Sequence, residues 1–184
     1  KSAPKAVVAI KRFRKINLVI NFIKMLKNLI TLIIILFYQI CHANEEGVII
    51  NVVDGDTVHL LNDNQEKLKV RLHHIDAPEL DQYYGKESKF ALEQLILNKK
   101  VTVISDKKDK YKRLLGVISL DEVDVNLEMI KAGAAWHFKK YAKFDQAKDQ
   151  YQIYDENEHQ AKLKKIGLWK ENAISPWLWR KNKK

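Results

Sequence analysis

The chain has 184 residues and a formal net charge of +10, from 33 basic and 23 acidic residues. Residues 1–43 hold eight Lys or Arg and no acid, so residues 44–184 carry 25 basic against 23 acidic residues. This near balance excludes bulk charge as an argument for nucleic-acid binding, and the length suits one domain with its own core.

Residues 1–43 are predicted to be an export signal or a membrane anchor. A mostly apolar run, residues 29–40, follows Lys24 and Lys27, and a small residue precedes a possible cut after Ala43. The run is shorter than the roughly 20 apolar residues of a membrane span, and Met25 is a candidate true start. We expect cleavage after Ala43 and a secreted or periplasmic protein. If residues 16–40 remain attached, the protein is instead membrane-anchored and faces outside.

Residues 44–184 are predicted to form one domain. Apolar segments typical of strands cover 47–53, 57–61, 68–72, 101–104 and 114–120, and helices are expected over 86–97, 125–132 and 147–165. Asp54-Gly55 favours a hairpin whose tight turn uses positive φ angles, and Gly133 and Gly167 are placed to end helices. Five short strands with helices between and after them favour a small closed β-barrel of the OB type with helices.

Three charged clusters interrupt these elements: residues 54–57 (DGDT), 71–79 (RLHHIDAPE) and 109–113 (DKYKR). Asp56 follows the first turn and Asp76 ends the third strand, so both can reach one end of the barrel. Two carboxylates, a backbone carbonyl and water form an all-oxygen site, which favours Ca²⁺ or Mg²⁺ over zinc. The alternative is that each Asp only shapes a turn or caps a strand.

Arg71, Glu79 and Arg113 supply the remaining groups needed to cut a phosphodiester. Glu79 could act as a general base for water that attacks phosphorus, and each arginine could donate two hydrogen bonds to phosphate oxygens. Arg71 and Asp76 are an odd number of positions apart, so they converge only if the strand bends before Asp76. The alternative for Glu79 and Arg113 is a solvated loop.

The order of these motifs closely resembles the staphylococcal nuclease family. The resemblance rests on D-G-D-T, R-L-x-x-I-D-A-P-E, D-K-Y-x-R and the segment from Val125-Asn126 to residues 133–135, and it runs from about residue 47 to residue 169. Residues 175–180 (SPWLWR) are similar to the tail of secreted bacterial members. The resemblance implies an OB-fold barrel with three α-helices and Ca²⁺-dependent hydrolysis of both DNA and RNA that leaves 3′-phosphates.

The resemblance also implies a role for each matching position. Ca²⁺ would be held by the carboxylates of Asp56 and Asp76 and the backbone carbonyl of Ala77. The catalytic groups would be Arg71, Glu79 and Arg113. The nucleotide would be contacted by Lys110, Tyr111 and Tyr141. Ala77, Lys112 and Lys139 depart from the family, where threonine, glycine and a second tyrosine are found.

The alternative to a nuclease is a noncatalytic OB-type module that binds nucleic acid or protein. Such a module is expected to have lost one or more of the charged groups, whereas this chain retains all five: Asp56, Arg71, Asp76, Glu79 and Arg113. DNA and RNA are the expected partners, and we expect a monomer with no stable protein partner. His73 and His74 are expected to be structural. Trp169, Trp177 and Trp179 are expected to seal an apolar patch on the barrel, although exposed aromatic rings can also stack on single strands.

Overall fold

The computed structural model describes residues 21–32 and 44–183. The chain divides into two units, Lys1–His42 and Ala43–Lys184. In the first unit residues 21–32 are helical, and none of the described helices is both long enough and apolar enough to span a membrane. The predicted cut after Ala43 and residues 33–40 of the apolar run lie outside the described residues.

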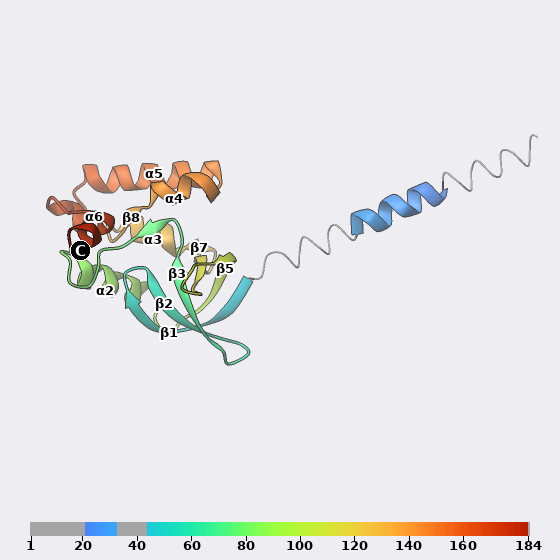
Figure 1. Ribbon diagram of the computed structural model, residues 1–184, viewed down its shortest axis with the longest axis horizontal. Coiled ribbons are helices and arrows are strands. Elements are labelled where there is room, and N and C mark those ends of the chain that lie inside the picture. Colours follow the sequence, from blue (N-terminus) through green and yellow to red (C-terminus); the bar gives the residue numbers. More distant parts are fainter. Residues whose placement is uncertain (1–20, 33–43, 184) are drawn as a thin grey trace, which may run out of the picture. The chain divides into compact units, whose positions relative to one another are not determined.

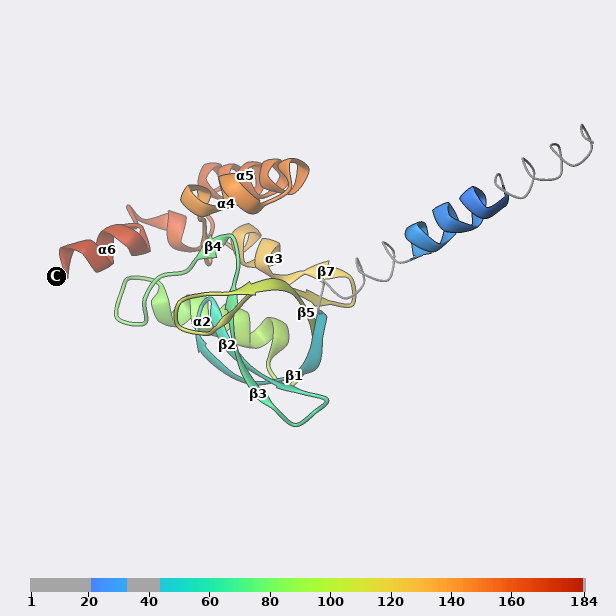
Figure 2. The same ribbon diagram turned by 45° about the vertical axis from the view of Figure 1, so that its right-hand side comes forward.

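Five strands of the second unit form a closed barrel: β1 (Asn44–Asp54), β2 (Thr57–Asn62), β3 (Lys67–Leu72), β5 (Lys100–Lys108) and β6 (Leu114–Leu120). The order β3-β2-β1-β5-β6 is antiparallel throughout, and β3 pairs in parallel with β6, which closes the barrel. Figure 2 shows these strands curving around the domain. The predicted five-stranded OB-type barrel with helices is therefore confirmed.

The domain contains three further short strands. β7 (Val123–Asp124) pairs with the end of β6, and β4 (Ile75–Asp76) pairs with β8 (Trp136–His137) in a separate two-stranded sheet. The β4–β8 pair matters for function, because it fixes Asp76 opposite Trp136.

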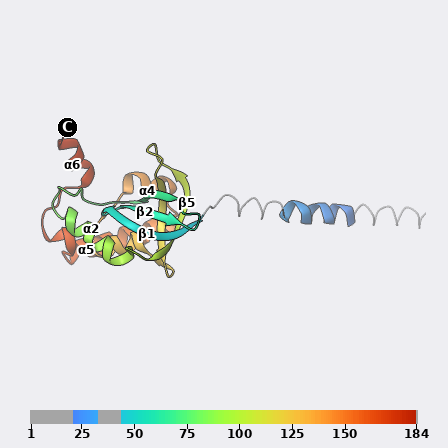
Figure 3. The same cartoon turned by 90° about the horizontal axis from the view of Figure 1, so that it is seen from below.

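Helices α2 (Gly85–Ile96), α3 (Val125–Lys131) and α5 (Lys148–Leu163) correspond to the three expected helices. Two further short helices, α4 (Lys139–Asp145) and α6 (Pro176–Asn182), and the 3-10 helix η1 (Gly167–Lys170) were not expected from the sequence. Helices α4 and α5 lie together on one side of the domain (Figure 1). In every view α6 lies at the end of the domain away from β5 (Figures 1 and 3).

The core follows from alternation along the strands. In β3, Val70 and Leu72 are buried while Lys69 stays exposed, so one face of the strand enters the barrel. Helix α2 covers the core with a stripe that includes Leu92 and Ile96, which are fully buried, as the predicted helical spacing requires.

Two local predictions were wrong. Gly55 does not use a positive φ angle; its lack of a side chain is needed because a Cβ there would lie 1.9 Å from Ser88 Oγ and 2.7 Å from Ala77 Cβ. The strand predicted over residues 101–104 is also too short, since β5 continues to Lys108 by pairing with β6.

Candidate active site

All nine candidate residues line a single cleft at one end of the barrel, with a volume of about 850 Å³. They come from the β1–β2 turn, from β3 and β4, from the segments that follow β4 and β5, and from α4. These residues are Asp56, Arg71, Asp76, Ala77, Glu79, Lys110, Tyr111, Arg113 and Tyr141. The three charged clusters of the sequence therefore form one site.

Asp56 is held in place by the tight turn between β1 and β2. Its backbone N–H donates to Asp54 Oδ1 at 3.0 Å, and its own Oδ2 accepts from the backbone N–H of Ala77 at 2.7 Å. The close packing of Gly55 against Ser88 brings this turn onto α2. Asp56 is consequently buried, and it is held both through its backbone N–H and through its carboxylate.

Arg71 joins the two candidate metal ligands. Its Nη2 lies 2.9 Å from Asp56 Oδ2 and 2.9 Å from Asp76 Oδ1, while Nη1 donates to the carbonyls of Leu72 at 2.6 Å and Ile75 at 2.9 Å. The bend that this convergence requires lies between β3 and β4, where His74 adopts a φ of 64°. Arg71 thus holds the bend and both carboxylates together.

The bend is also fixed from the far side by a residue of α3. Asn126 is fully buried; its amide donates to the carbonyls of His73 at 2.9 Å and Gly116 at 3.1 Å, and its carbonyl accepts from the backbone N–H of Ile118 at 3.1 Å. A buried amide with all these partners satisfied is costly to replace. Asn126 therefore supports the site without reaching into it.

The electrostatics of Asp56 favour an additional positive charge. Burial is the largest cause that raises its pKa, and the negative charges of Asp54 and Asp76 add to it, whereas Arg71 and the Ala77 N–H oppose it. The balance raises the pKa of Asp56 to about 8. A divalent cation between Asp56 and Asp76 would reverse this balance, because it favours the ionised forms of both acids.

Glu79 lies at the edge of the cleft, with 38% of its side chain exposed, and it accepts a hydrogen bond of 2.7 Å from Arg180 Nη1. Arg180 Nη2 also lies 2.7 Å from Asp76 Oδ2. Arg180 ends the SPWLWR tail motif and is a site residue that the sequence pattern did not identify. The only signal in the sequence was an arginine directly after the second tryptophan of this motif, and that pattern alone is too weak to assign a role.

Arg113 is held by the loop that carries it. Its Nε and Nη2 both lie 2.7 Å from Asp109 Oδ2, and Asp109 Oδ1 accepts from the backbone N–H groups of Tyr111 at 2.8 Å and Arg113 at 3.0 Å. Partial burial would raise the pKa of Asp109, but these hydrogen bonds outweigh it and the pKa lies below its usual value. Lys112 adopts a φ of 63°, so this turn keeps the conformation that glycine favours.

The three candidate nucleotide contacts are exposed at the rim. Lys110 Nζ lies 5.0 Å from the centre of the Tyr111 ring, and Tyr141 is 52% exposed. Lys139, where the family has a second tyrosine, does not line this cleft; its Nζ pairs with Asp155 and with Glu158. The structure therefore brings Tyr111 and Tyr141 to the cleft and directs Lys139 elsewhere.

His73 and His74 stack on each other, with ring centres 3.8 Å apart, and their Nε2 atoms lie 3.4 and 3.1 Å from the carboxylate of Asp145. Among the described residues these three form a group whose ligand atoms all lie within 4.8 Å of one another. Lys107 also pairs with Asp145, so this carboxylate is already neutralised by protein groups. The arrangement joins the β3–β4 bend to α4.

Two buried carboxylates, a solvent-facing carboxylate and two arginines in one cleft are the groups that a phosphodiester hydrolase needs. The family model described as Staphylococcal nuclease homologue matches residues 69–171. An "Uncharacterized endonuclease" of Haemophilus influenzae is 35% identical over 162 residues, which cover 86% of this chain and 87% of that protein. A "Micrococcal nuclease" of Shigella flexneri is 34% identical over 152 residues, which cover 77% and 84%.

The chain belongs to the staphylococcal nuclease family. It is a hydrolase of the nuclease class, and the resemblance inferred from its motifs is confirmed.

Proposed function

We propose that this protein is a Ca²⁺-dependent, sugar-nonspecific nuclease that hydrolyses phosphodiester bonds of DNA and RNA and leaves 3′-phosphates. The observation that carries the proposal is the joint placement of Asp56 and Asp76, each with an oxygen 2.9 Å from one nitrogen of Arg71, beside the exposed carboxylate of Glu79.

The residues present fit a hard divalent cation. Asp56, Asp76 and the backbone carbonyl of Ala77 would hold it, and they offer only oxygen ligands, as Ca²⁺ and Mg²⁺ require. When bound, the ion supplies positive charge to the phosphate oxygens as negative charge builds on them. Of these two ions, Ca²⁺ is the one that the resemblance of the motifs to the staphylococcal nuclease family implies.

The remaining steps belong to side chains of this chain. Glu79 accepts a proton from the water that attacks phosphorus, which its exposed position at the cleft edge permits. Arg113 donates hydrogen bonds to phosphate oxygens and stabilises their charge in the transition state. Arg71 holds the carboxylates of Asp56 and Asp76 close together and adds its own positive charge to the same side of the cleft.

Substrate contacts at the rim support cleavage of both nucleic acids. Lys110 and Tyr111 are exposed and adjacent, and Tyr141 faces the same cleft from α4. A lysine and flat aromatic rings recognise the phosphates and bases that DNA and RNA share, so they impose no choice of sugar. A monomer contains the whole of this cleft.

The experiment is digestion of plasmid DNA and of RNA with Ca²⁺, with Mg²⁺ and with a chelator, followed by analysis of the product ends. We expect cutting with Ca²⁺, loss of cutting in chelator and 3′-phosphate ends. Cutting that persists in chelator would exclude the metal mechanism, and the absence of cutting with either ion would favour a noncatalytic nucleic-acid- or protein-binding module.

We also propose export to the periplasm or the medium, with residues 1–43 removed. The support is the apolar run of residues 29–40 behind Lys24 and Lys27, and a small residue at Ala43. N-terminal sequencing of the protein isolated from cells tests this. Asn44 as the first residue is the expected result, whereas a membrane-bound protein that retains residues 16–40 would contradict it.

A further inference from the structure

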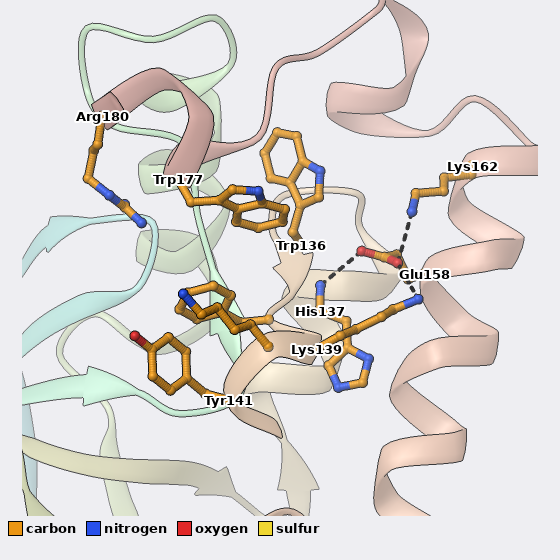
Figure 4. A pocket seen from close by; sticks show the side chains of 10 residues that line it. Trp136, His137, Lys139, Tyr141, Glu158, Lys162, Trp177 and Arg180 are labelled. Carbon is orange, nitrogen blue, oxygen red and sulfur yellow. Dashed lines mark hydrogen bonds and ion pairs between the residues drawn. The ribbon is translucent and has the colours of Figure 1, made fainter. Parts of the chain in front are cut away.

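A second cleft, with a volume of about 580 Å³, adjoins the first (Figure 4). It lies between the segment 136–141, helix α5 and helix α6. Phe138, Tyr141 and Arg180 line both clefts. Because these three residues are shared, a chain molecule bound in the first cleft can continue into the second.

The wall contributed by α6 is aromatic and held in a fixed orientation. The Trp177 ring stacks on Phe138, with centres 5.5 Å apart and planes 12° from parallel, and meets Trp136 edge-on at 6.4 Å. Trp177 is nevertheless 38% exposed. A rigid indole with an open surface is what an unpaired base stacks on, whatever its sequence.

Four basic residues also line the second cleft, one of them on α6. Lys139, Lys140, Lys162 and Arg180 line the cleft, and Glu158 is the one carboxylate among its described lining residues. Glu158 lies at the floor, where it accepts from the His137 backbone N–H at 3.0 Å and pairs with Lys139 at 3.1 Å and Lys162 at 2.9 Å (Figure 4). The lining residues therefore comprise four basic groups and one acidic group, although Lys139 and Arg180 also pair with acids that do not line this cleft.

Lys140 is the basic residue best placed for a ligand phosphate. It is exposed, and its Nζ lies 5.7 Å from the centre of the Tyr141 ring, at the junction of the two clefts. Helix α4 repeats the arrangement one turn later, where Lys143 Nζ lies 4.8 Å from the Phe144 ring, but this second pair lines neither cleft. The chain thus provides its own matched control.

We propose that the second cleft binds the nucleotide next to those held in the active-site cleft, on a single strand that passes Arg180 and stacks a base on Trp177. The inference rests on the proposed nuclease function and adds a subsite built by the C-terminal helix. The volume is in the range of pockets that take one small organic ligand, which suits one unpaired nucleotide rather than a duplex.

Binding of fluorescent single-stranded DNA tests the proposal in a Glu79→Gln background, with strands of three and ten nucleotides. Lys140→Gln should weaken binding of the long strand by roughly threefold to tenfold and reduce the slope of log affinity against log salt by about 0.7, as loss of one phosphate contact requires. Trp177→Ala should weaken it by roughly 5- to 150-fold, the effect of losing one stacked base. Neither variant should change binding of the three-nucleotide strand by more than about twofold, because a short strand held by the active-site contacts need not reach the second cleft.

Lys143→Gln and Phe144→Ala are the controls and should bind the long strand as the background does. If Lys140→Gln leaves the affinity and the salt slope for the long strand unchanged, or if Lys143→Gln reduces both equally, the subsite does not exist. Failure of the nuclease function would show separately, as absence of cutting by the unaltered protein.

Discussion

Arg180 Nη1 donates a hydrogen bond of 2.7 Å to Glu79 Oε1 across 101 positions of the chain. The same guanidinium binds Asp76 through Nη2 at 2.7 Å. The last helix therefore places a positive charge on a candidate metal ligand and on the candidate base at once. Pro176 is buried at the start of this helix, and Lys183 pairs with Asp81 near its end, so the charge is held in place.

We predict that Arg180→Ala strengthens Ca²⁺ binding by about tenfold, because removal of a unit positive charge within a few ångströms of the cation lowers their repulsion. Calorimetric titration with Ca²⁺ measures the effect without relying on activity. Lys183→Ala is the matched control: it removes the same charge from the residue directly after the same helix, which pairs with Asp81 instead. Weaker Ca²⁺ binding by Arg180→Ala would contradict this account, since it would mean that Arg180 orients the Asp76 carboxylate for binding the ion.

Glu79→Gln should reduce the rate of DNA cleavage by roughly 10²- to 10⁴-fold, the range for loss of a general base. The side chain is partly exposed and the amide can still accept the hydrogen bond from Arg180, so the unfolding temperature should change little. Parallel measurements of cleavage rate and thermal unfolding separate the two effects. Near-normal turnover would remove Glu79 from the role assigned to it.

Asp56 makes the stability of the metal-free protein depend on pH. Its carboxyl has a pKa of about 8 in the folded state, against a usual value of 3.8, mainly because it is buried. Below about pH 4 it is protonated in both states; as pH rises toward 8, the unfolded chain releases the proton more readily and the folded state loses stability. The free energy of unfolding in chelator should therefore fall between pH 4 and pH 8.

Asp56→Asn tests this pH dependence. The amide carbonyl can still accept from the Ala77 N–H, and the amide nitrogen can donate to Thr57, so the variant should be more stable than the native protein at pH 8 in chelator, by on the order of 2 kcal/mol. Urea unfolding at pH 5 and pH 8 measures both proteins. Added Ca²⁺ should stabilise the native protein but not the variant, and an equal effect of Ca²⁺ on both would place the ion elsewhere.

The barrel was predictable because its strands alternate. Val70 and Leu72 face inward while their neighbours are polar, and this period identifies a strand without any knowledge of its partners. The end of β5 was missed because Ser105 to Lys108 are polar, and their strand conformation comes from pairing with β6. Helix α6 was missed for a similar reason, since its structure depends on packing of Trp177 against Phe138, far from it in the sequence.

The residues of the candidate site were predictable from the sequence, but the hydrogen bonds and ion pairs between them were not. Spacing within the motifs indicated that Asp56, Arg71 and Asp76 belong together, provided that the chain bends after β3, and His74 supplies that bend with its positive φ. The contact of Arg180 with Glu79 depends on how the C-terminal segment packs, which no local pattern encodes.

Gly55→Ala should destabilise the protein by roughly 1–3 kcal/mol, as overpacking does in a closely packed interior. The added Cβ would meet Ser88 Oγ at 1.9 Å, and relief would have to move the turn that carries Asp56. Urea unfolding gives the loss, and the double variant Gly55→Ala/Ser88→Ala should recover part of it because the nearest clashing atom is gone. A fully additive pair would show that the clash with Ser88 is not the cause.

The hydrogen bonds and ion pair of Asp109 with Arg113 indicate that Asp109 affects the reaction by orienting Arg113. Arg113→Ala should reduce the cleavage rate by about 10²- to 10³-fold, by analogy with the loss of other preorganised donors. Asp109→Asn keeps an acceptor for the backbone N–H groups of Tyr111 and Arg113 but turns an amide nitrogen toward the guanidinium, so a misplaced Arg113 should cost roughly 10-fold.

The double variant Asp109→Asn/Arg113→Ala distinguishes positioning from an independent effect. If Asp109 serves only to orient the guanidinium, its replacement adds nothing once that group is absent, and the double variant should cleave DNA at the rate of Arg113→Ala alone. If the two losses instead multiply, Asp109 contributes by another route, such as shaping the loop that presents Lys110 and Tyr111. Separate measurement of kcat and KM then identifies that route, because loss of a rim contact raises KM while kcat stays near that of Arg113→Ala.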